Sequence, residues 1–264
     1  MKFTNSLFKG KLIKRYKRFF VDIKSNNQII TAHCPNTGSM MGLLDKENEV
    51  WLLKNNDPKR KLKYTLEIIK SKKKLIGVNT HRANRIVEHG IKNSLINEFK
   101  NIKLFKAEFK YSKSTRFDFL CDKNIIEVKN VTLNRKNNIA EFPDAITTRG
   151  SKHLLALVEA IKRGYKSNVL FLVQIQNIEF FKIAKDIDKE YYNNYKIAVE
   201  AGVKFLAYRC KIGPKEIKIE GTPGKQKTFS TLNPGAPLVG FKIKSALLGI
   251  HAIFCLPSLN SPGL

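Results

Sequence analysis

Three charged residues, Asp118, Glu127 and Lys129, lie on two short apolar runs that are joined by a tight polar turn. Side chains alternate between the two faces of a β-strand, so Glu127 and Lys129 share one face. Neighbouring carboxylates attract hard divalent cations, which choose oxygen ligands. A lysine beside such a cation could hold a phosphate or a water molecule. Together these residues indicate metal-assisted hydrolysis of a phosphodiester.

The turn between the two runs gives the carboxylates a testable geometry. If residues 122–123 form a two-residue hairpin loop, Cys121 pairs with Asn124. Counting back from that pair places Asp118 opposite Glu127. Like charges in this position destabilise a sheet, and Mg²⁺ or Mn²⁺ between them would remove the repulsion. The alternative is a solvated strand face, because half-exposed antiparallel strands also alternate charged and apolar residues.

A second polar group precedes a segment with helical periodicity. Ser151 is expected to N-cap a helix there, and the amides of a helix N-terminus bind phosphate readily. Arg149 and Lys152 add positive charge to that position. His153 is a candidate phosphate donor or general acid, against the simpler role of a helix histidine with one hydrogen bond. Gln174, on an apolar strand, is expected to make a structural hydrogen bond, with a side chain that reaches the site as the alternative.

The charge balance predicts a polyanionic partner. The chain has 49 Lys and Arg against 22 Asp and Glu, a net charge of +27. Nucleic acid is the first candidate, while an anionic membrane surface is weaker because no basic amphipathic anchor is visible. Biased genomic base composition could also enrich Lys. Aromatic rings among the N-terminal cations suit a single-strand platform, although the same rings could fill a core. The candidate phosphate contacts are Lys17, Arg18, Lys59, Arg60, Lys61, Arg116, Arg149 and Lys152.

The cysteines indicate a reducing compartment. All four are widely spread, without a CxxC pair, which argues against a zinc module and a disulfide scaffold. The N-terminus lacks the apolar region of a secretory signal, and the longest apolar stretch, residues 246–256, is too short to span a bilayer. These features predict a cytoplasmic protein. Adjacent His33 and Cys34 would point to opposite faces of a strand, which argues against a nucleophile pair.

The elements that must position these residues fall into two folded parts and a tail. Residues 1–80 contain several short strands separated by turn residues, which is typical of a small barrel. Residues 81–220 alternate helical and strand patterns and form an α/β part. Residues 221–264 contain no Asp or Glu and many Gly, Pro, Ser and Thr, so a poorly packed tail is expected.

Within the α/β part, one predicted helix carries Glu98 as a further acidic candidate, and a polar loop follows the charged hairpin. Glu108 is a similar candidate on a strand. The expected helices cover residues 83–99, 151–163 and 187–201, the strands cover 102–109, 116–121, 124–129, 169–175, 203–208 and 216–219, and the loop covers 130–150.

Two longer segments carry a family resemblance. Residues 32–40 (AHCPNTGSM) and 141–154 (EFPDAITTRGSKHL), with shorter motifs such as Asn79-Thr80, Asn84 and residues 127–133, resemble the sugar fermentation stimulation protein A family. The likeness covers residues 1 to about 220, and the tail departs from it. It implies an α+β chain, with an N-terminal OB-fold-like β-barrel followed by a PD-(D/E)XK nuclease-like α/β domain.

The resemblance also implies a function. The nuclease-like pattern falls on Asp118, Glu127 and Lys129 as catalytic residues, with Asp118 and Glu127 as ligands of Mg²⁺ or Mn²⁺. Family members are described as binding DNA without sequence preference and are linked to regulation of sugar (maltose) metabolism. We therefore expect a DNA-binding protein, with RNA as a further partner, and a metal-dependent nuclease. The alternative is a non-catalytic DNA-binding regulatory protein with a relic nuclease fold.

Overall fold

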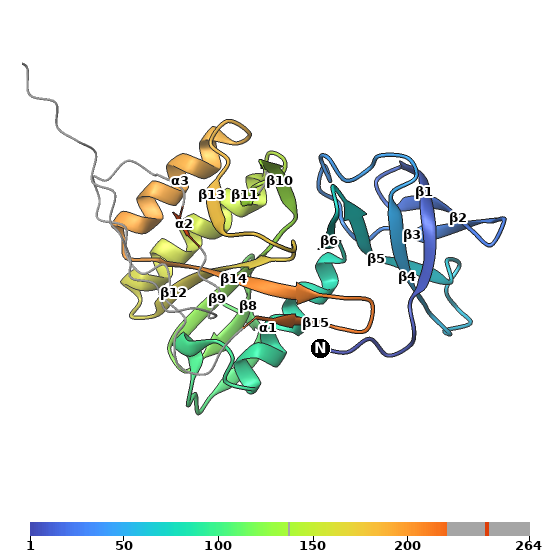
Figure 1. Cartoon of the computed structure of the whole chain (residues 1–264). Coiled ribbons are helices and arrows are strands. Elements are labelled where there is room, and N and C mark those ends of the chain that lie inside the picture. Colours follow the sequence, from blue (N-terminus) through green and yellow to red (C-terminus); the bar gives the residue numbers. More distant parts are fainter. Residues whose placement is uncertain (137, 221–240, 243–264) are drawn as a thin grey trace, which may run out of the picture.

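The computed structural model describes residues 1–136, 138–220 and 241–242. An N-terminal OB-like barrel is followed by an α/β domain with a mixed sheet (Figure 1), which confirms the expected α+β architecture. Apart from residues 241–242, the predicted tail at 221–264 lies outside the described residues. Within the described ranges no helix is long and apolar enough to cross a membrane.

A six-stranded sheet forms the barrel, in the order β3-β2-β1-β4-β5-β6. Its strands are β1 (Phe8–Tyr16), β2 (Phe20–Ser25), β3 (Gln28–His33), β4 (Glu49–Lys54), β5 (Tyr64–Ser71) and β6 (Lys74–Gly77). Pairing of His33 with Thr65 joins β3 to β5 and closes the sheet on itself. β1 was not predicted as a strand, because its lysines and arginines outnumber the residues that reach the core, such as Leu12.

The α/β domain is built on a second six-stranded sheet, with helices on both faces (Figure 1). Its elements are α1 (Thr80–Lys92), η1 (Asn97–Phe99), β7 (Phe105–Lys110), β8 (Arg116–Cys121), β9 (Asn124–Val131), α2 (Thr148–Lys162), β12 (Lys166–Val173), α3 (Lys189–Glu200), β14 (Lys204–Ile212) and β15 (Ile217–Ile219). The sheet order is β15-β14-β12-β9-β8-β7, with β12 parallel to β9 and β14. Ile126 and Val128 pack with α1, whereas Val169 and Phe171 pack with α2 and α3.

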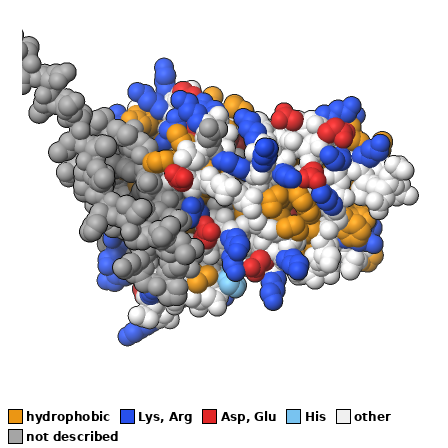
Figure 2. All heavy atoms as spheres, viewed as in Figure 1, with side chains coloured by type: hydrophobic (Ala, Val, Ile, Leu, Met, Phe, Trp, Pro, Cys, Tyr) orange, Lys and Arg blue, Asp and Glu red, His pale blue; other side chains and the backbone are white. Residues whose placement is uncertain are grey.

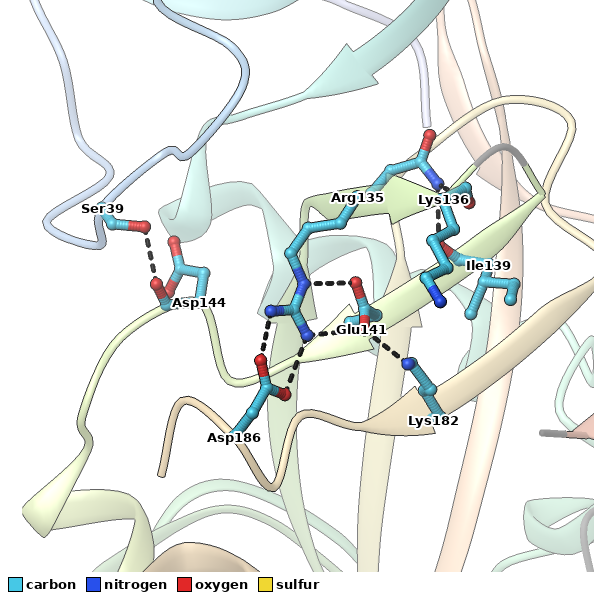
Figure 3. Close-up of polar contacts among 9 residues, drawn as sticks. Ser39, Arg135, Lys136, Ile139, Glu141, Asp144, Lys182 and Asp186 are labelled. Atoms are coloured by element: carbon cyan, nitrogen blue, oxygen red, sulfur yellow. Dashed lines mark hydrogen bonds and ion pairs between the residues drawn. The ribbon is translucent and has the colours of Figure 1, made fainter. Parts of the chain in front are cut away.

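The polar loop predicted at residues 130–150 is wrong. β9 continues to Val131, and a smaller sheet follows, in the order β10-β11-β13-β16. Its strands are β10 (Leu133–Lys136), β11 (Ile139–Phe142), β13 (Phe180–Ile183) and β16 (Phe241–Lys242). Glu141 is buried in this sheet, where Arg135 donates two hydrogen bonds to it and Lys182 lies 3.0 Å away (Figure 3). These ion pairs allow the Glu141 carboxylate to be buried in a strand, although a charged residue in such a polar segment is typical of a loop.

Two helix boundaries also differ from the prediction. α1 begins at Thr80 and ends at Lys92, and Ser94 then takes a positive φ of 54°. The sequence keeps apolar residues at helical spacing as far as Phe99, because Phe99 packs in the same core as α1. The backbone, however, leaves the helix after Lys92. The N-cap of α2 is Thr147 rather than Ser151, because the Thr147 hydroxyl accepts the Gly150 N–H at 3.1 Å.

The barrel contacts the α/β domain through β6 and through the loop after β3, as well as through α1. β6 is linked to the chain after β12 by an Ile76–Ile175 bridge and by the Gly77 N–H, which donates to the Gln174 carbonyl at 3.0 Å. In the loop after β3, the Ser39 hydroxyl donates to the Asp144 carbonyl at 2.6 Å (Figure 3). A Cβ on neighbouring Gly38 would lie 2.4 Å from the Asp144 carboxylate, so a larger residue here would displace that side chain.

Candidate active site

The β8–β9 hairpin has the predicted register. Cys121 pairs with Asn124, and Phe119 pairs with Ile126. Asp118 and Glu127 are next in this register, but the ladder ends before them. Asp118 Oδ2 instead accepts the Val128 N–H at 2.6 Å. The carboxylate therefore takes the place of a backbone acceptor and is held against β9.

Asp118 is also held from α1. Asn84 Nδ2 donates to Asp118 Oδ1 at 2.7 Å, so one helix and two strands fix this carboxylate. Burial and the nearby charge of Glu127 raise the pKa of Asp118 to about 6. The mutual repulsion expected of the two carboxylates is thus present in the protein.

Glu127 is the most buried member of the group, with 5% of its surface exposed. Lys129 Nζ donates to Glu127 Oε1 at 2.6 Å, and His153 Nδ1 lies 2.5 Å from the same oxygen. Burial alone would raise the pKa of Glu127, but Lys129 and His153 outweigh it, so the pKa lies below its ordinary value. Glu127 Oε2 is buried and has no hydrogen-bond partner among the described residues.

A divalent cation fits this pair of carboxylates. Glu127 Oε2 lacks a donor, and each Asp118 oxygen keeps a second lone pair beyond its single hydrogen bond. Over the described residues, no three His, Cys, Asp or Glu side chains lie together as a metal site. A cation here would therefore complete its shell with water or phosphate oxygens, as Mg²⁺ usually does.

Other polar groups near Glu127 were not predicted from the sequence. Tyr191 on α3 has a buried hydroxyl without a partner in the described structure. Burial and the charge of Glu127 raise the pKa of Tyr191. Asn84 occurs in the family motifs but had no predicted role, because no spacing rule connects it with Asp118. Buried water is the usual partner of such hydroxyls.

The predicted phosphate contacts come from both folded parts. Arg149 and Lys152 are exposed on α2, the helix of His153, and exposed Arg116 lies on β8 two residues before Asp118. The remaining contacts are exposed on the barrel: Lys17 and Arg18 in the β1–β2 turn, and Lys59, Arg60 and Lys61 between β4 and β5. Lys and Arg side chains are spread over both folded parts on the face drawn in Figure 2.

The aromatic residues of the barrel divide between core and surface. Trp51 is buried, whereas 42% of Phe8 and 45% of Phe19 are exposed. Lys14 Nζ lies 5.4 Å from the ring centre of Tyr16. Core packing is therefore confirmed for Trp51, whereas a single-strand platform formed by the exposed rings stays a prediction.

Three further candidates lie apart from the carboxylate pair. Glu98 is in η1 rather than on the predicted helix, and it accepts a hydrogen bond from Tyr208 on β14. Gln174 makes a structural hydrogen bond to Asn130 Oδ1 at 2.6 Å, as expected. Cys34 is buried, and burial raises the pKa of its thiol, so it has the environment of a core residue.

Asp118→Asn is expected to stabilise the metal-free protein. The folded protein keeps the Asp118 proton to a higher pH than the unfolded chain, so stability falls as the pH rises from about 4 to about 6. At pH 7 the ionised Asp118 therefore lowers the free energy of unfolding by about 3 kcal/mol, because folding raises its pKa. Urea unfolding in EDTA should show Asp118→Asn more stable at pH 7 by roughly 1–3 kcal/mol, with no gain at pH 4. Asp45→Asn, at an exposed site, is the control, and equal stability of Asp118→Asn and wild type at pH 7 would contradict the prediction.

Comparison with known proteins gives one consistent family. The model of the sugar fermentation stimulation protein RE domain matches residues 81–216, and that of the SfsA N-terminal OB domain matches residues 13–78. The solved structure of Pyrococcus furiosus SfsA in complex with Ca²⁺ has a TM-score of 0.76 and 24% identity, over 84% of this chain and 96% of that chain. At this identity the likeness shows the fold alone.

Curated relatives match most of the chain. A sugar fermentation stimulation protein homolog of Pelagibacter ubique is 65% identical over 224 residues, 83% of this chain and 97% of the relative. A homolog of Alteromonas mediterranea is 42% identical over 234 residues, 84% of this chain and 98% of the relative. With both family domains in order and relatives at this identity, the chain belongs to the sugar fermentation stimulation protein (SfsA) family.

Proposed function

We propose that this protein is a metal-dependent phosphodiesterase that acts on nucleic acid without sequence specificity. The observation that carries the proposal is the buried Glu127 oxygen without a donor, beside an Asp118 whose pKa is raised by burial and by Glu127. A cation would give Glu127 Oε2 a partner and would reduce the repulsion between Asp118 and Glu127. The Ca²⁺ in the solved structure of the Pyrococcus furiosus relative supports a divalent ion in this fold.

The side chains have separable roles in this proposal. When bound, the divalent ion polarises a phosphoryl oxygen and lowers the pKa of a bound water. Lys129, held by Glu127, offsets negative charge that develops on the phosphate. His153 acts as a positioning residue, because its ring nitrogen fixes Glu127 Oε1 and leaves Oε2 for the cation. Asn84 fixes Asp118 in the same way.

Nucleic acid is the proposed substrate because of charge and placement. A net charge of +27 concentrates polyanions at the surface. Arg116 and Arg149, which lie on elements that carry the site, make no ion pair within it and are exposed for phosphate. Groups of this kind contact the phosphate backbone and not the bases, so specificity should be low.

The second candidate is a DNA-binding regulator of sugar metabolism without hydrolysis. One observation favours it: Lys129 and His153 already occupy Glu127 Oε1, so the site is partly satisfied by the protein itself. The link to sugar metabolism comes from the names of the relatives.

Cleavage assays separate these candidates. Purified protein is incubated with labelled single-stranded and double-stranded DNA and RNA in Mg²⁺, Mn²⁺, Ca²⁺ or EDTA. Products in Mg²⁺ or Mn²⁺ that are absent in EDTA support the phosphodiesterase. Binding without products in any of these metals supports the regulator.

Nucleic-acid binding should depend steeply on salt, and the dependence should follow the predicted phosphate contacts. Each contact adds about 0.9 to the slope of log affinity against log salt for duplex DNA. Arg149→Gln with Lys152→Gln should therefore lower the slope by about two. The matched control is Lys204→Gln, an exposed lysine on β14. Filter binding between 50 and 200 mM salt measures the slope. An unchanged slope would show that α2 does not contact the nucleic-acid phosphates.

A further inference from the structure

Three cationic or titratable side chains meet where the barrel adjoins α1. His33 ends β3 and pairs with Thr65 of β5. Arg60, from the chain between β4 and β5, reaches the same threonine, with Nη1 3.5 Å from its hydroxyl oxygen. The His33 imidazole and the Arg60 guanidinium therefore belong to one small region of the barrel surface.

His81 joins this region from the first turn of α1. The preceding Thr80 donates its hydroxyl to the Pro35 carbonyl at 2.9 Å, two residues beyond His33. The α1 N-terminus thus rests on the chain that leaves β3. Burial, His81 and Arg60 together lower the pKa of His33, in agreement with this proximity.

Arg60 gives the region a permanent positive charge, and the two histidines can add to it when protonated. Among the described residues, His33, His81 and Arg60 make no ion pair. On β5, Glu67 is taken by Arg82 and Asn79. In the segment of Arg60, the Asp57 carboxylate accepts the Lys59 backbone N–H at 2.9 Å. His81 and Arg60 are exposed, so a ligand can reach them.

His81 lies one helical turn before Asn84, the α1 residue that binds Asp118. His81 and Asn84 are three residues apart on α1, so they share a face and differ by about 4.5 Å along the helix axis. Asn84 in turn binds Asp118. Successive phosphates of one strand advance by about 3.4 Å along a duplex, a step similar to the offset of about 4.5 Å between His81 and Asn84 along α1.

We propose that His33, His81 and Arg60 form a binding subsite for a backbone phosphate one or two nucleotides from the one at Asp118 and Glu127. This subsite rests on the proposed nucleic-acid function and extends it to a defined path, from the barrel along α1 to the hairpin. A phosphate there favours protonated imidazoles, so binding takes up protons. Affinity should rise as the pH falls, by up to about tenfold per pH unit for each proton taken up.

The test uses the full chain in an Asp118→Asn background and in EDTA, so that neither cleavage nor titration of Asp118 contributes. His33→Gln/His81→Gln is compared with His89→Gln, an exposed histidine in the last turn of α1. Affinity for a single-stranded DNA 12-mer is measured between pH 5.5 and 8. A second arm follows the imidazole signals by NMR while inorganic phosphate is added.

The double variant should lose most of the pH dependence, while His89→Gln keeps it. The His33 and His81 signals should move with phosphate, while that of His89 stays. Unchanged pH dependence in the double variant, or signals that do not move, would overturn the subsite. If the background protein binds no DNA at any pH, the nucleic-acid function itself fails, and phosphate shifts at His33 and His81 would then support only an anion site.

Discussion

Asp118→Asn and Glu127→Gln should each abolish metal-dependent cleavage while nucleic-acid binding persists. Both substitutions keep the shape of the side chain and remove the charge that, in the proposed function, holds a divalent cation. A metal that polarises a phosphoryl oxygen contributes several kcal/mol, so the rate should fall by about 10²–10³-fold or more. Binding should survive because it rests on cations spread over both folded parts.

Cleavage rates and equilibrium binding are measured on the same labelled DNA, in Mg²⁺ and in Mn²⁺. Glu159→Gln is the matched control, since Glu159 is a half-exposed carboxylate on the helix that carries His153 and pairs with Lys162 and Arg163, outside the site. Asp118→Asn has a second expected signature, the gain in stability without metal, so an inactive variant that is also more stable is folded. Cleavage that persists in both variants would place the activity elsewhere or in a contaminant.

The hairpin shows how far a sequence can predict a site. Strand alternation places Glu127 and Lys129 on one face, and the two-residue turn sets the Cys121–Asn124 register. Both follow from local rules with a period of two. The contacts of Asn84 and His153 depend on how α1 and α2 pack across the sheet. No local pattern encodes that packing, so the sequence does not predict that Asn84 contacts Asp118 or that His153 contacts Glu127.

The errors in the fold have a related origin. The polar residues of 130–150 predict a loop, but Arg135 and Lys182 neutralise Glu141 within a sheet. Its strand partner β13 lies about 40 residues further along the chain, so the pairing cannot be read from the local sequence. In the same way, the charged β1 is a strand because β2 and β4 pair with both of its edges.

Arg82→Met should be strongly destabilising, because it leaves a carboxylate buried without its cation. The carboxylate of Glu67 on β5 is 1% exposed and accepts Arg82 Nε and Nη2, each at 2.7 Å. Only the amide of Asn79, at 3.0 Å, would remain to it. Breaking a buried pair from one side typically costs about 3–5 kcal/mol.

The double variant Arg82→Met/Glu67→Leu separates this cause from a loss of packing. With both charges removed no uncompensated carboxylate remains, and stability should return to within about 1–2 kcal/mol of wild type. Arg116→Met is the control, because its exposed pair with Glu108 is worth at most about 1 kcal/mol. Urea unfolding is followed by the fluorescence of Trp51, in the barrel, and by circular dichroism, which reports both folded parts.

The ion pair of Arg82 and Glu67 also connects the stability of the fold to the geometry of the candidate active site. Glu67 belongs to the barrel, and Arg82 belongs to the helix that carries Asn84, two residues before this ligand of Asp118. Freeing α1 from the barrel should therefore let Asn84 move away from Asp118, so the folded Arg82→Met protein should cleave more slowly than wild type. The double variant tests whether packing alone restores that alignment. A loss of stability below about 1 kcal/mol in Arg82→Met would show that water reaches Glu67 and that this ion pair does not fix α1 to the barrel.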